Sequence, residues 1–400
     1  MHVLLTANYS PWSAYSGGGQ RSTHNLAVAY ADRGHDVTVV YTKPPWETVE
    51  VPAVPYRVRW AALPALRSRR RAPLRVLSPL FVARAAAGLL DTTDGPTVVH
   101  PQGEEGALLP WVCRPRGVPL VATPRYPTYP DALSARPRGL RAWGRLLLFH
   151  HKYLLLELLV RRADRVCPTS TSAASMVRSA YGLDADRVTI VPNGVTDAFL
   201  AADAAYRPDG PLVFFGRLAP EKGVDVLVEA LARLAADGYD RRCLIIGRGP
   251  AEADVRRAVA ARGLDDRVEL TGWLDPPVLA ERLAGAAAAV LPSREESFGN
   301  AMAESMAAGV PVVSTRAGSI PEVVRDGETG VLLPPDDGAA LARAVARLLD
   351  DPERARALAA AGRRRVEAHF TWDAVAARYE QIFERVRASG ATPSPDAPPS

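Results

Sequence analysis

Two acidic residues flank one predicted helix start near residue 300. A small, apolar stretch at 286–291 predicts a buried strand, and Glu296 lies in the turn that follows it. Ser297-Phe-Gly299 then opens a predicted helix, which contains Glu304 and ends at Gly309. Glu304 lies about six residues into this helix, roughly 9 Å along its axis at about 1.5 Å per residue.

This spacing suits one kind of extended ligand. A helix start exposes unpaired N–H groups and partial positive charge, which favour a phosphate group. A ligand with a diphosphate at the helix start could also place hydroxyl groups at both carboxylates, and a nucleotide-sugar has this layout. The alternative interpretation is a solvated helix with two ordinary surface acids. The spacing alone does not separate the two.

Two cations follow another predicted strand. The stretch 211–216 predicts a strand, and Arg217 and Lys222 flank the turn at its carboxyl end. Two fixed cations there could hold a diphosphate and neutralise its charge as it leaves. They could instead be surface cations, although a cation at a helix start is mildly unfavourable, and this favours a bound anion.

The N-terminal part begins with a pattern of strand, loop, helix and strand. Residues 2–6 and 36–42 predict strands, and residues 20–33 predict a helix between them. Such a unit opens a doubly wound sheet. The loop before the helix ends in Gly17, Gly18 and Gly19, which would let the backbone approach a ligand closely. The strict G-x-G-x-x-G pattern is absent, so a plain flexible turn remains an alternative.

Chain length and composition favour two globular domains. The chain has 400 residues, more than one core usually holds, with 48% hydrophobic and 23% charged residues. We expect an α/β fold of two doubly wound domains with ligands at the strand ends facing a central cleft. The expected parts are an N-terminal domain (1–197), a linker (198–210), a C-terminal domain (211–371), a C-terminal helix (372–388) and a disordered tail (389–400).

The cysteines and the N-terminus indicate a cytoplasmic protein. Cys113, Cys167 and Cys243 are odd in number and scattered, which favours a reducing compartment over a disulfide framework. The first residues lack the basic and long apolar regions of a signal peptide. No apolar run is long enough to span a membrane, because charged and His residues interrupt the best candidate, 146–160.

Basic residues concentrate in the N-terminal half. Arginines recur in 57–75 and in the predicted helix 138–162. One interpretation is a solvated loop at 57–75 and a core-facing helix at 138–162. The other is a surface that binds an anionic acceptor or the inner face of the cell membrane. Asp184 and Asp186 match the D-x-D of metal-dependent sugar transferases, but they fall in a helix-to-strand connection. We interpret that match as incidental and expect neither a metal site nor a nucleic-acid partner.

A set of short motifs runs in order along residues 2–388. It consists of the Gly17–Gly19 loop, Ala163-Asp-Arg-Val166, Val191-Pro-Asn-Gly-Val195, Gly216-Arg-Leu-x3-Lys-Gly223, Gly247-Arg-Gly-Pro250, Glu296-Ser-Phe-Gly-x4-Glu304, Gly318-Ser-Ile-Pro-Glu322 and Asp326-Gly-x2-Gly330. In these motifs the chain resembles the family-4 retaining glycosyltransferases, glycosyl transferases group 1. The resemblance implies the GT-B fold, with two Rossmann-like domains and a C-terminal helix that crosses back to the N-terminal domain. The first domain would bind the acceptor and the second the nucleotide-sugar.

The resemblance also implies roles for the charged residues. Arg217 and Lys222 would bind the donor diphosphate, Glu296 would contact the hydroxyls of the donor sugar, and Glu304 would bind ribose. The anomeric configuration would be retained, with a leaving phosphate oxygen accepting the proton of the acceptor. Arg217, Lys222 and Glu296 are then the catalytic candidates, and Glu296 is not a general base.

Backbone groups would complete the donor site. The amides of Phe298, Gly299 and Asn300, together with the Gly17–Gly19 loop, would hold phosphate, and the turn at Gly247 would border the base. The implied co-substrate is a UDP- or GDP-sugar, with no other cofactor and no metal.

The acceptor side departs from the family pattern. Many relatives carry a His after the strand that corresponds to 119–123, whereas this chain reads Thr123-Pro-Arg-Tyr-Pro127. Arg125 or Tyr126 could take its place, or His100 could serve. The implied acceptor is a glycan, a glycolipid or a natural product.

Two other functions fit the same resemblance. One is a GT-B sugar-nucleotide epimerase or a phosphorylase; the pyridoxal-dependent kind needs a Schiff-base lysine, and the one lysine of the C-terminal domain, Lys222, is already assigned to phosphate. The other is a degenerate glycan- or nucleotide-binding protein, which the retained donor-site charges disfavour. The sequence does not identify the sugar, the base, the acceptor or the oligomeric state.

Overall fold

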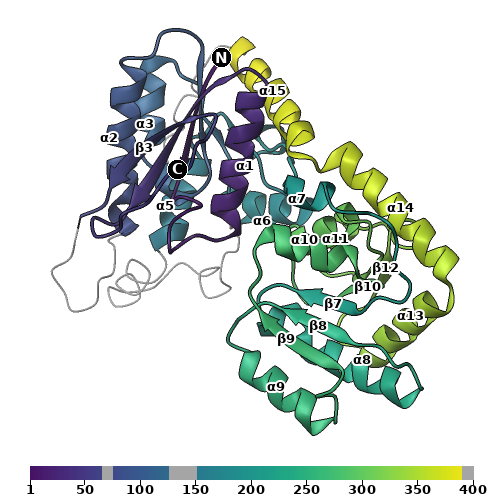
Figure 1. The fold of residues 1–400 in the computed structure, drawn as a ribbon. Helices are drawn as coiled ribbons and strands as arrows, with labels where there is room; N and C mark the ends of the chain where they lie inside the picture. The colour runs from purple at the N-terminus through teal and green to yellow at the C-terminus, as the bar shows by residue number, and fades with distance from the viewer. Residues whose placement is uncertain (65–74, 126–150, 390–400) are drawn as a thin grey trace. The chain divides into compact units, whose positions relative to one another are not determined.

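The computed structural model describes residues 1–64, 75–125 and 151–389 (Figure 1). The chain forms two compact units. Unit 1 contains Met1–Gly194 and the chain from Val375 onward, and unit 2 contains Val195–Ala374. Within the described ranges, no helix is both long and apolar enough to cross a membrane.

A parallel sheet forms the centre of unit 1. Its strands are β1 (His2–Ala7), β2 (Asp36–Lys43), β3 (Arg57–Ala62) and β4 (Thr97–Pro101), in the order β3-β2-β1-β4. β5 (Val121–Ala122) pairs with β6 (Arg165–Val166) and continues the sheet beside β4, where the Val99 amide donates to the Pro119 carbonyl at 2.9 Å. All six residues of β1 are buried, as expected for a central parallel strand that is covered on both faces.

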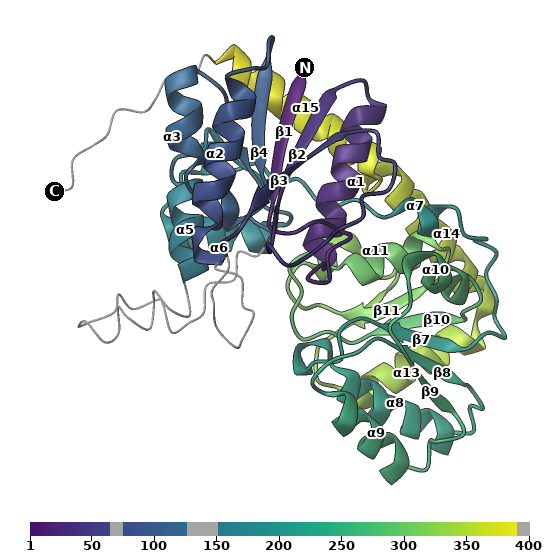
Figure 2. The ribbon, with the colours of Figure 1, turned by 60° about the vertical axis from the view of Figure 1, so that its left-hand side comes forward.

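Helices cover both faces of this sheet. They are α1 (Gly18–Asp32), α2 (Ser78–Leu90), α3 (Leu109–Cys113), α5 (His151–Val160) and α6 (Thr171–Tyr181), with the short 3-10 turns η1 (Arg75–Leu77), η2 (Glu104–Gly106), η3 (Arg114–Arg116) and η5 (Ala185–Arg187). Figure 2 shows α2, α3 and α5 on one side of the strands and α1 and α15 (Trp372–Ala388) on the other. Leu4 and Val99 of the sheet pack with Val82, Leu109 and Leu159 in one apolar core.

The C-terminal helix belongs to the packing of unit 1. The Tyr379 ring of α15 lies 4.5 Å from the His100 ring, and its hydroxyl lies 2.7 Å from Thr123 Oγ1. Glu380 binds Arg33 and His35, each at 2.7 Å. The expectation that this helix returns to the N-terminal domain is therefore confirmed.

Unit 2 contains a six-stranded parallel sheet. Its strands are β7 (Leu212–Phe215), β8 (Cys243–Ile246), β9 (Val268–Gly272), β10 (Ala288–Leu291), β11 (Val312–Thr315) and β12 (Val331–Leu333), in the order β12-β11-β10-β7-β8-β9. Its helices are α7 (Asp197–Leu200), α8 (Val224–Ala236), α9 (Glu252–Ala261), α10 (Pro276–Ala284), α11 (Asn300–Ala307), α12 (Ile320–Val323), α13 (Gly338–Asp350) and α14 (Pro352–His369), with the 3-10 turn η6 (Pro220–Lys222). Figures 1 and 2 show α8 and α9 on the opposite face from α10 and α11.

Both sheets share one topology. In each, the strands lie in the order 3-2-1-4-5-6 of their appearance in the unit, counting the β5-β6 pair beside β4. The order reverses between β1 and β4 and between β7 and β10. Ligands of doubly wound folds bind at the carboxyl ends of the strands at this reversal, because the connecting loops diverge there and leave room. The reversal therefore directs attention to the loops after these four strands.

The apolar stretch 188–195 also predicts a strand that ends in a Pro-Asn-Gly turn, and this prediction is wrong. Residues 188–195 form no strand; only single bridges connect Val188 with Val166 and Val195 with Thr371. Pro192 has no N–H to donate and the Asn193-Gly pair favours a turn, so this stretch joins no ladder. Val191 and Val195 are buried, whereas Ile190 is 41% exposed.

We predict that Glu380→Gln weakens the attachment of α15. Its hydrogen bonds from Arg33, and next those from His35, lower the pKa of Glu380. A carboxylate with a lowered pKa stabilises the fold above its ordinary pKa, and this contribution disappears as the pH falls through the lowered value. At pH 7 the variant should lose about 1 kcal/mol, or about 2–4 °C in melting temperature, and the loss should vanish in acid. Thermal unfolding from pH 7 to pH 3 measures this.

Glu384→Gln is the matched control, because Glu384 is an exposed acid of the same helix. Equal melting temperatures for wild type and Glu380→Gln at pH 7 would contradict the prediction.

Candidate functional site

An ion pair joins the two loops at the strand reversal of unit 2. Lys222 Nζ, after β7, lies 2.5 Å from Glu296 Oε1, after β10, and both side chains are mostly buried. Gly223 makes this approach possible: its φ is +65°, and a Cβ there would lie 2.0 Å from the Pro292 carbonyl oxygen. The two loops can therefore meet only if residue 223 has no side chain.

The loop after β11 holds the backbone of Glu296. The backbone N–H and the hydroxyl of Ser319 both donate to the Glu296 carbonyl at 3.1 Å. Gly318 has a φ of +52°, and a Cβ there would lie 2.2 Å from the same carbonyl oxygen. The Gly318–Glu322 motif, which follows β11, thus holds the backbone that carries the Glu296 carboxylate.

Arg217 differs from Lys222 in its exposure. Its side chain is 64% exposed and forms an ion pair with Glu221 one turn along the chain. A guanidinium that is so exposed can exchange its partner easily, because surface ion pairs contribute only about 0–1 kcal/mol. The two predicted cations therefore lie after the same strand, one free to move and the other held in place.

The remaining donor candidates lie after the neighbouring strands of the same sheet. The helix expected from residue 297 begins at Asn300 as α11, and Gly299 (φ +101°) is its N-cap. Phe298 is buried against Phe370, and Glu304 is half-buried on α11. Gly247 follows β8 with a φ of +144°, and its N–H donates to the Gly272 carbonyl at 2.8 Å.

Unit 1 carries a cavity at its own strand reversal. Its volume is about 590 Å³. The loop after β1 contributes Asn8, Tyr9, Tyr15, Gly17 and Gly19, the loop after β4 contributes Gln102, Glu104 and Glu105, and Arg125, Lys152 and Tyr153 complete the wall. Gln20 of α1 accepts from the Gly17 N–H at 3.0 Å and donates to the Asn8 carbonyl at 2.7 Å, which orders the glycine loop. Gly17 and Gly19 thus lie where backbone can reach a ligand.

Two adjacent acids in this cavity were not foreseen. Glu105 is only 2% exposed; it accepts from the Thr6 hydroxyl and from the Gln102 N–H, both at 3.1 Å. Burial, and next the neighbouring Glu104, raises the pKa of Glu105 to about 8. Glu104 accepts from Asn8 Nδ2 at 3.0 Å. Their position directly after a strand of the reversal is the signal that could have identified them.

The three acceptor-side candidates separate in the structure. Arg125 lines the cavity, where it donates to Gln102 at 2.5 Å and to Asn193 at 2.8 Å. His100 is fully buried, with Tyr30 and Thr123 within hydrogen-bonding distance of its two ring nitrogens, and burial lowers its pKa well below the usual value. It packs under α15 and does not line the cavity. Tyr126 lies outside the described residues.

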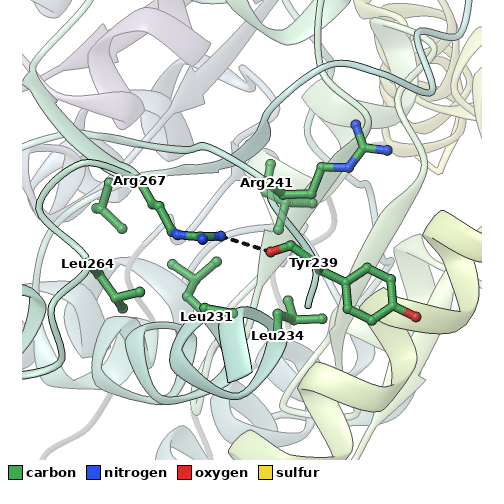
Figure 3. A pocket seen from close by; sticks show the side chains of 9 residues that line it. Leu231, Leu234, Tyr239, Arg241, Leu264 and Arg267 are labelled. Carbon is green, nitrogen blue, oxygen red and sulfur yellow. Dashed lines mark hydrogen bonds between the residues drawn. The ribbon is translucent and has the colours of Figure 1, made fainter. Parts of the chain in front are cut away.

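A small cavity of unit 2 does not match this chemistry. Figure 3 shows this cavity, where Leu231, Leu234 and Leu264 surround about 10 Å³ and Arg267 donates to the Tyr239 carbonyl at 3.0 Å. It lies beside the first residues of β7 and β9, at the amino ends of the strands, whereas the ion pair lies at their carboxyl ends. It has room for about one water molecule. No group of three or more metal-ligating side chains occurs in the part of the chain that the structure describes.

We predict that Glu105→Gln stabilises unit 1 in alkali. Because the folded pKa is raised, keeping this acid buried costs stability as the pH rises from the ordinary carboxyl value towards about 8. The variant should melt near wild type at pH 5 and above it at pH 8–9, as thermal unfolding across this range would measure. Glu104→Gln, which removes only the neighbouring charge, should give a smaller change. A variant that melts below wild type throughout would show that Glu105 is a stabilising anion.

Comparison with known proteins identifies the family. Residues 210–351 match the family model described as glycosyl transferases group 1, and residues 16–199 match the model of glycosyltransferase family 4. Glycogen synthase of Mycobacterium tuberculosis is 30% identical over 418 residues, covering 100% of this chain and 98% of the relative. The MMP alpha-(1->4)-mannosyltransferase of Mycolicibacterium hassiacum is 29% identical, covering 96% and 98%.

Solved structures give the same result for the fold. Sucrose-phosphate synthase from Thermosynechococcus elongatus superposes with a TM-score of 0.75 at 26% identity, covering 97% of this chain and 99% of that one. Anabaena Alr3699/HepE in complex with UDP-glucose superposes with a TM-score of 0.68 at 19% identity, covering 96% and 100%. The chain belongs to glycosyltransferase family 4, has the GT-B fold, and is a glycosyltransferase that uses a nucleotide-sugar as donor.

Proposed function

We propose that this enzyme transfers a sugar, with retention, from a UDP- or GDP-sugar held by unit 2 to a hydroxyl of an acceptor held by unit 1. The observation that carries the proposal is the contact between Lys222 and Glu296 at the strand reversal. It places a cation and a carboxylate side by side where a doubly wound sheet binds ligands. A sugar diphosphate needs this pair of groups, one for phosphate and one for hydroxyls.

The donor would replace the ion pairs of the ligand-free site. Lys222 and Arg217 would turn from Glu296 and Glu221 to the diphosphate, which offers more acceptor oxygens and charge. The Glu296 carboxylate would then accept hydroxyl groups of the sugar, and Glu304 would accept those of the ribose. The amides from Phe298 to Asn300, at the start of α11, would face a phosphate oxygen, and the backbone of Gly17–Gly19 would also hold phosphate.

In the proposed reaction, the bond between the anomeric carbon and the leaving phosphate oxygen breaks, and a bond from that carbon to the acceptor oxygen forms on the same face. The proton of the acceptor hydroxyl passes to the leaving phosphate oxygen, so no protein base is required. Lys222 and Arg217 stabilise the charge that develops on the diphosphate. We therefore propose that transfer requires no metal ion.

The acceptor would occupy the cavity of unit 1. Its volume of about 590 Å³ lies in the range of small-molecule sites. Its lining combines carboxyl, amide and cationic groups with Tyr9, Tyr15 and Tyr153, which suits a polyhydroxylated ring. We propose a glycan, glycolipid or natural-product acceptor. D-inositol 3-phosphate glycosyltransferase of Thermomonospora curvata is 34% identical over 57% of this chain and 58% of its own length, and its name supports a polyol acceptor.

We propose a cytoplasmic location. The three cysteines are free and buried, and burial raises the pKa of Cys113 to about 12, as suits thiols that stay reduced. Contact with an anionic membrane stays a prediction. Several arginines of the two basic segments, at 67–71 and 138–145, lie outside the described residues. Arg57 and Arg161 of these segments form ion pairs with Asp36 and Glu157.

We predict that Lys222→Ala and Glu304→Ala abolish most of the transfer. Loss of the Lys222 charge at the leaving diphosphate should cost about 10²-fold or more in kcat, whereas loss of Glu304 should weaken binding of the donor ribose. A thermal-shift screen with UDP, GDP, ADP and their common sugars would first select the donor, because a ligand at about 100 times its Kd stabilises the fold by about 2.7 kcal/mol. Sugar transfer to a panel of polyol acceptors would then be compared among the variants.

Lys43→Ala is the matched control, since Lys43 lies on β2 of unit 1, where it covers the Trp60 ring. Wild-type rates in both site variants would refute the donor site. Donor stabilisation without any transfer would favour the degenerate binding protein, and isomerisation of the donor sugar would favour an epimerase.

A further inference from the structure

We propose that Arg294 is a positioning residue that clamps three loops around the donor site and thereby sets the distance between Lys222 and Glu296. The proposal rests on the donor-binding function proposed for that site. Arg294 lies two residues before Glu296, and its side chain extends towards the loop that carries Lys222. None of the short motifs quoted from the sequence contains it, and its side-chain partners are distant in the sequence.

The guanidinium of Arg294 uses all of its nitrogens. Nη1 and Nη2 donate to the two carboxylate oxygens of Asp225 at 2.9 and 2.7 Å, and Nε donates to Asp336 at 2.5 Å. Nη1 also donates to the Pro220 carbonyl. The Arg294 backbone N–H donates to the Glu221 carbonyl at 2.8 Å. Side chain and backbone therefore hold the same neighbouring loop.

The partners surround Lys222 on both sides. Pro220 begins the 3-10 turn that ends at Lys222, and Asp225 lies in the first turn of α8. With Arg294 on the other loop, the clamp fixes the backbone before and after Lys222 relative to the backbone just before Glu296. The distance between these two site residues is thus determined by contacts outside the site itself.

The third partner of Arg294 is Asp336, whose backbone conformation serves this contact. Asp336 lies between β12 and α13 with a φ of +62°, in the left-handed region, which has a conformational cost for a residue other than glycine. This conformation presents its carboxylate to Arg294 Nε. The ion pair offsets part of that cost, and it attaches the loop after β12 to the loop after β10.

Arg294 is not itself a cation for the donor. Its pKa is raised by Asp225 and Asp336, and the pKa of Asp225 is lowered by Arg294, so the charges neutralise one another. Arg217, by contrast, is largely exposed with a single partner. The basic residues at this strand reversal therefore have different tasks: Lys222 and Arg217 face the ligand, and Arg294 holds the loops.

Substitution of Arg294 tests the clamp. Arg294→Gln should lower kcat/KM for the donor about tenfold or more, since a small misplacement of reacting groups has effects up to about 10²-fold. Arg294→Lys should not restore it, because an ammonium cannot contact Asp225 with two nitrogens and Asp336 with a third. Asp225→Asn combined with Arg294→Gln should lower the rate little further than Arg294→Gln alone, since both break the same contact. Arg233→Gln removes an exposed α8 arginine paired with Glu229, and should leave the rate near wild type.

A second measurement does not require activity. The chain contains three lysines, Lys43, Lys152 and Lys222. An amine-reactive reagent with peptide mass spectrometry therefore reports Lys222 against two internal references. Arg294→Gln should raise the modification rate of Lys222 relative to Lys43 and Lys152, because a loosened loop exposes a side chain that is 23% exposed when the loop is clamped. Melting temperatures identify a variant that fails to fold, in which case Asp336→Asn, which removes one arm, replaces it.

The outcomes separate the clamp from the donor site. Wild-type kcat/KM together with wild-type Lys222 modification in folded Arg294→Gln would overturn the clamp. A wild-type protein that transfers no sugar would overturn the proposed function. In that case the modification rate of Lys222 in Arg294→Gln, compared with wild type, would still test the clamp. A rate loss in Arg294→Gln that Arg294→Lys restores would mean that charge alone matters, and would also overturn it.

Discussion

The approach of two loops across the strand reversal of unit 2 is the constraint on which the donor site depends. Parallel strands in the observed order send the loops after β7 and β10 apart, and Gly223 allows them to meet again over the Pro292 carbonyl. Only at that separation can Lys222 contact Glu296. Opposite charges that are mostly removed from water stabilise each other only with good geometry, so the backbone must hold them in place. Gly318 and Arg294 provide that support from two other directions.

The ion pair also explains how a charged site stays intact without ligand. Each cation of the donor site has a carboxylate partner on the same or a neighbouring loop, so no unpaired charge is buried. In the proposed donor complex, a diphosphate would displace these partners because it carries more charge, and Glu296 would then accept sugar hydroxyl groups. Binding would exchange one set of polar contacts for another.

Unit 1 uses the same topology for different chemistry. Its reversal carries amides, tyrosines and two acids beside the cations Arg125 and Lys152, and Glu105 keeps its proton because burial disfavours its charge. α15 covers the other face of this sheet and packs on His100. His100 therefore lies in the core and does not line the cavity. The cavity chemistry thus falls to Arg125 and to the residues after β1 and β4.

The sequence by itself determined the fold class and the main donor candidates. Alternation of strand and helix patterns predicts two doubly wound units, and the glycines mark tight approaches because only glycine tolerates them, as at Gly223. Tertiary structure alone decided which distant side chains meet: Arg294 finds Asp225 and Asp336 across 69 and 42 residues, and Glu105 becomes buried. The failed strand at 188–195 has the same origin. Local patterns encode the elements, whereas burial and partners depend on packing between segments far apart in the chain.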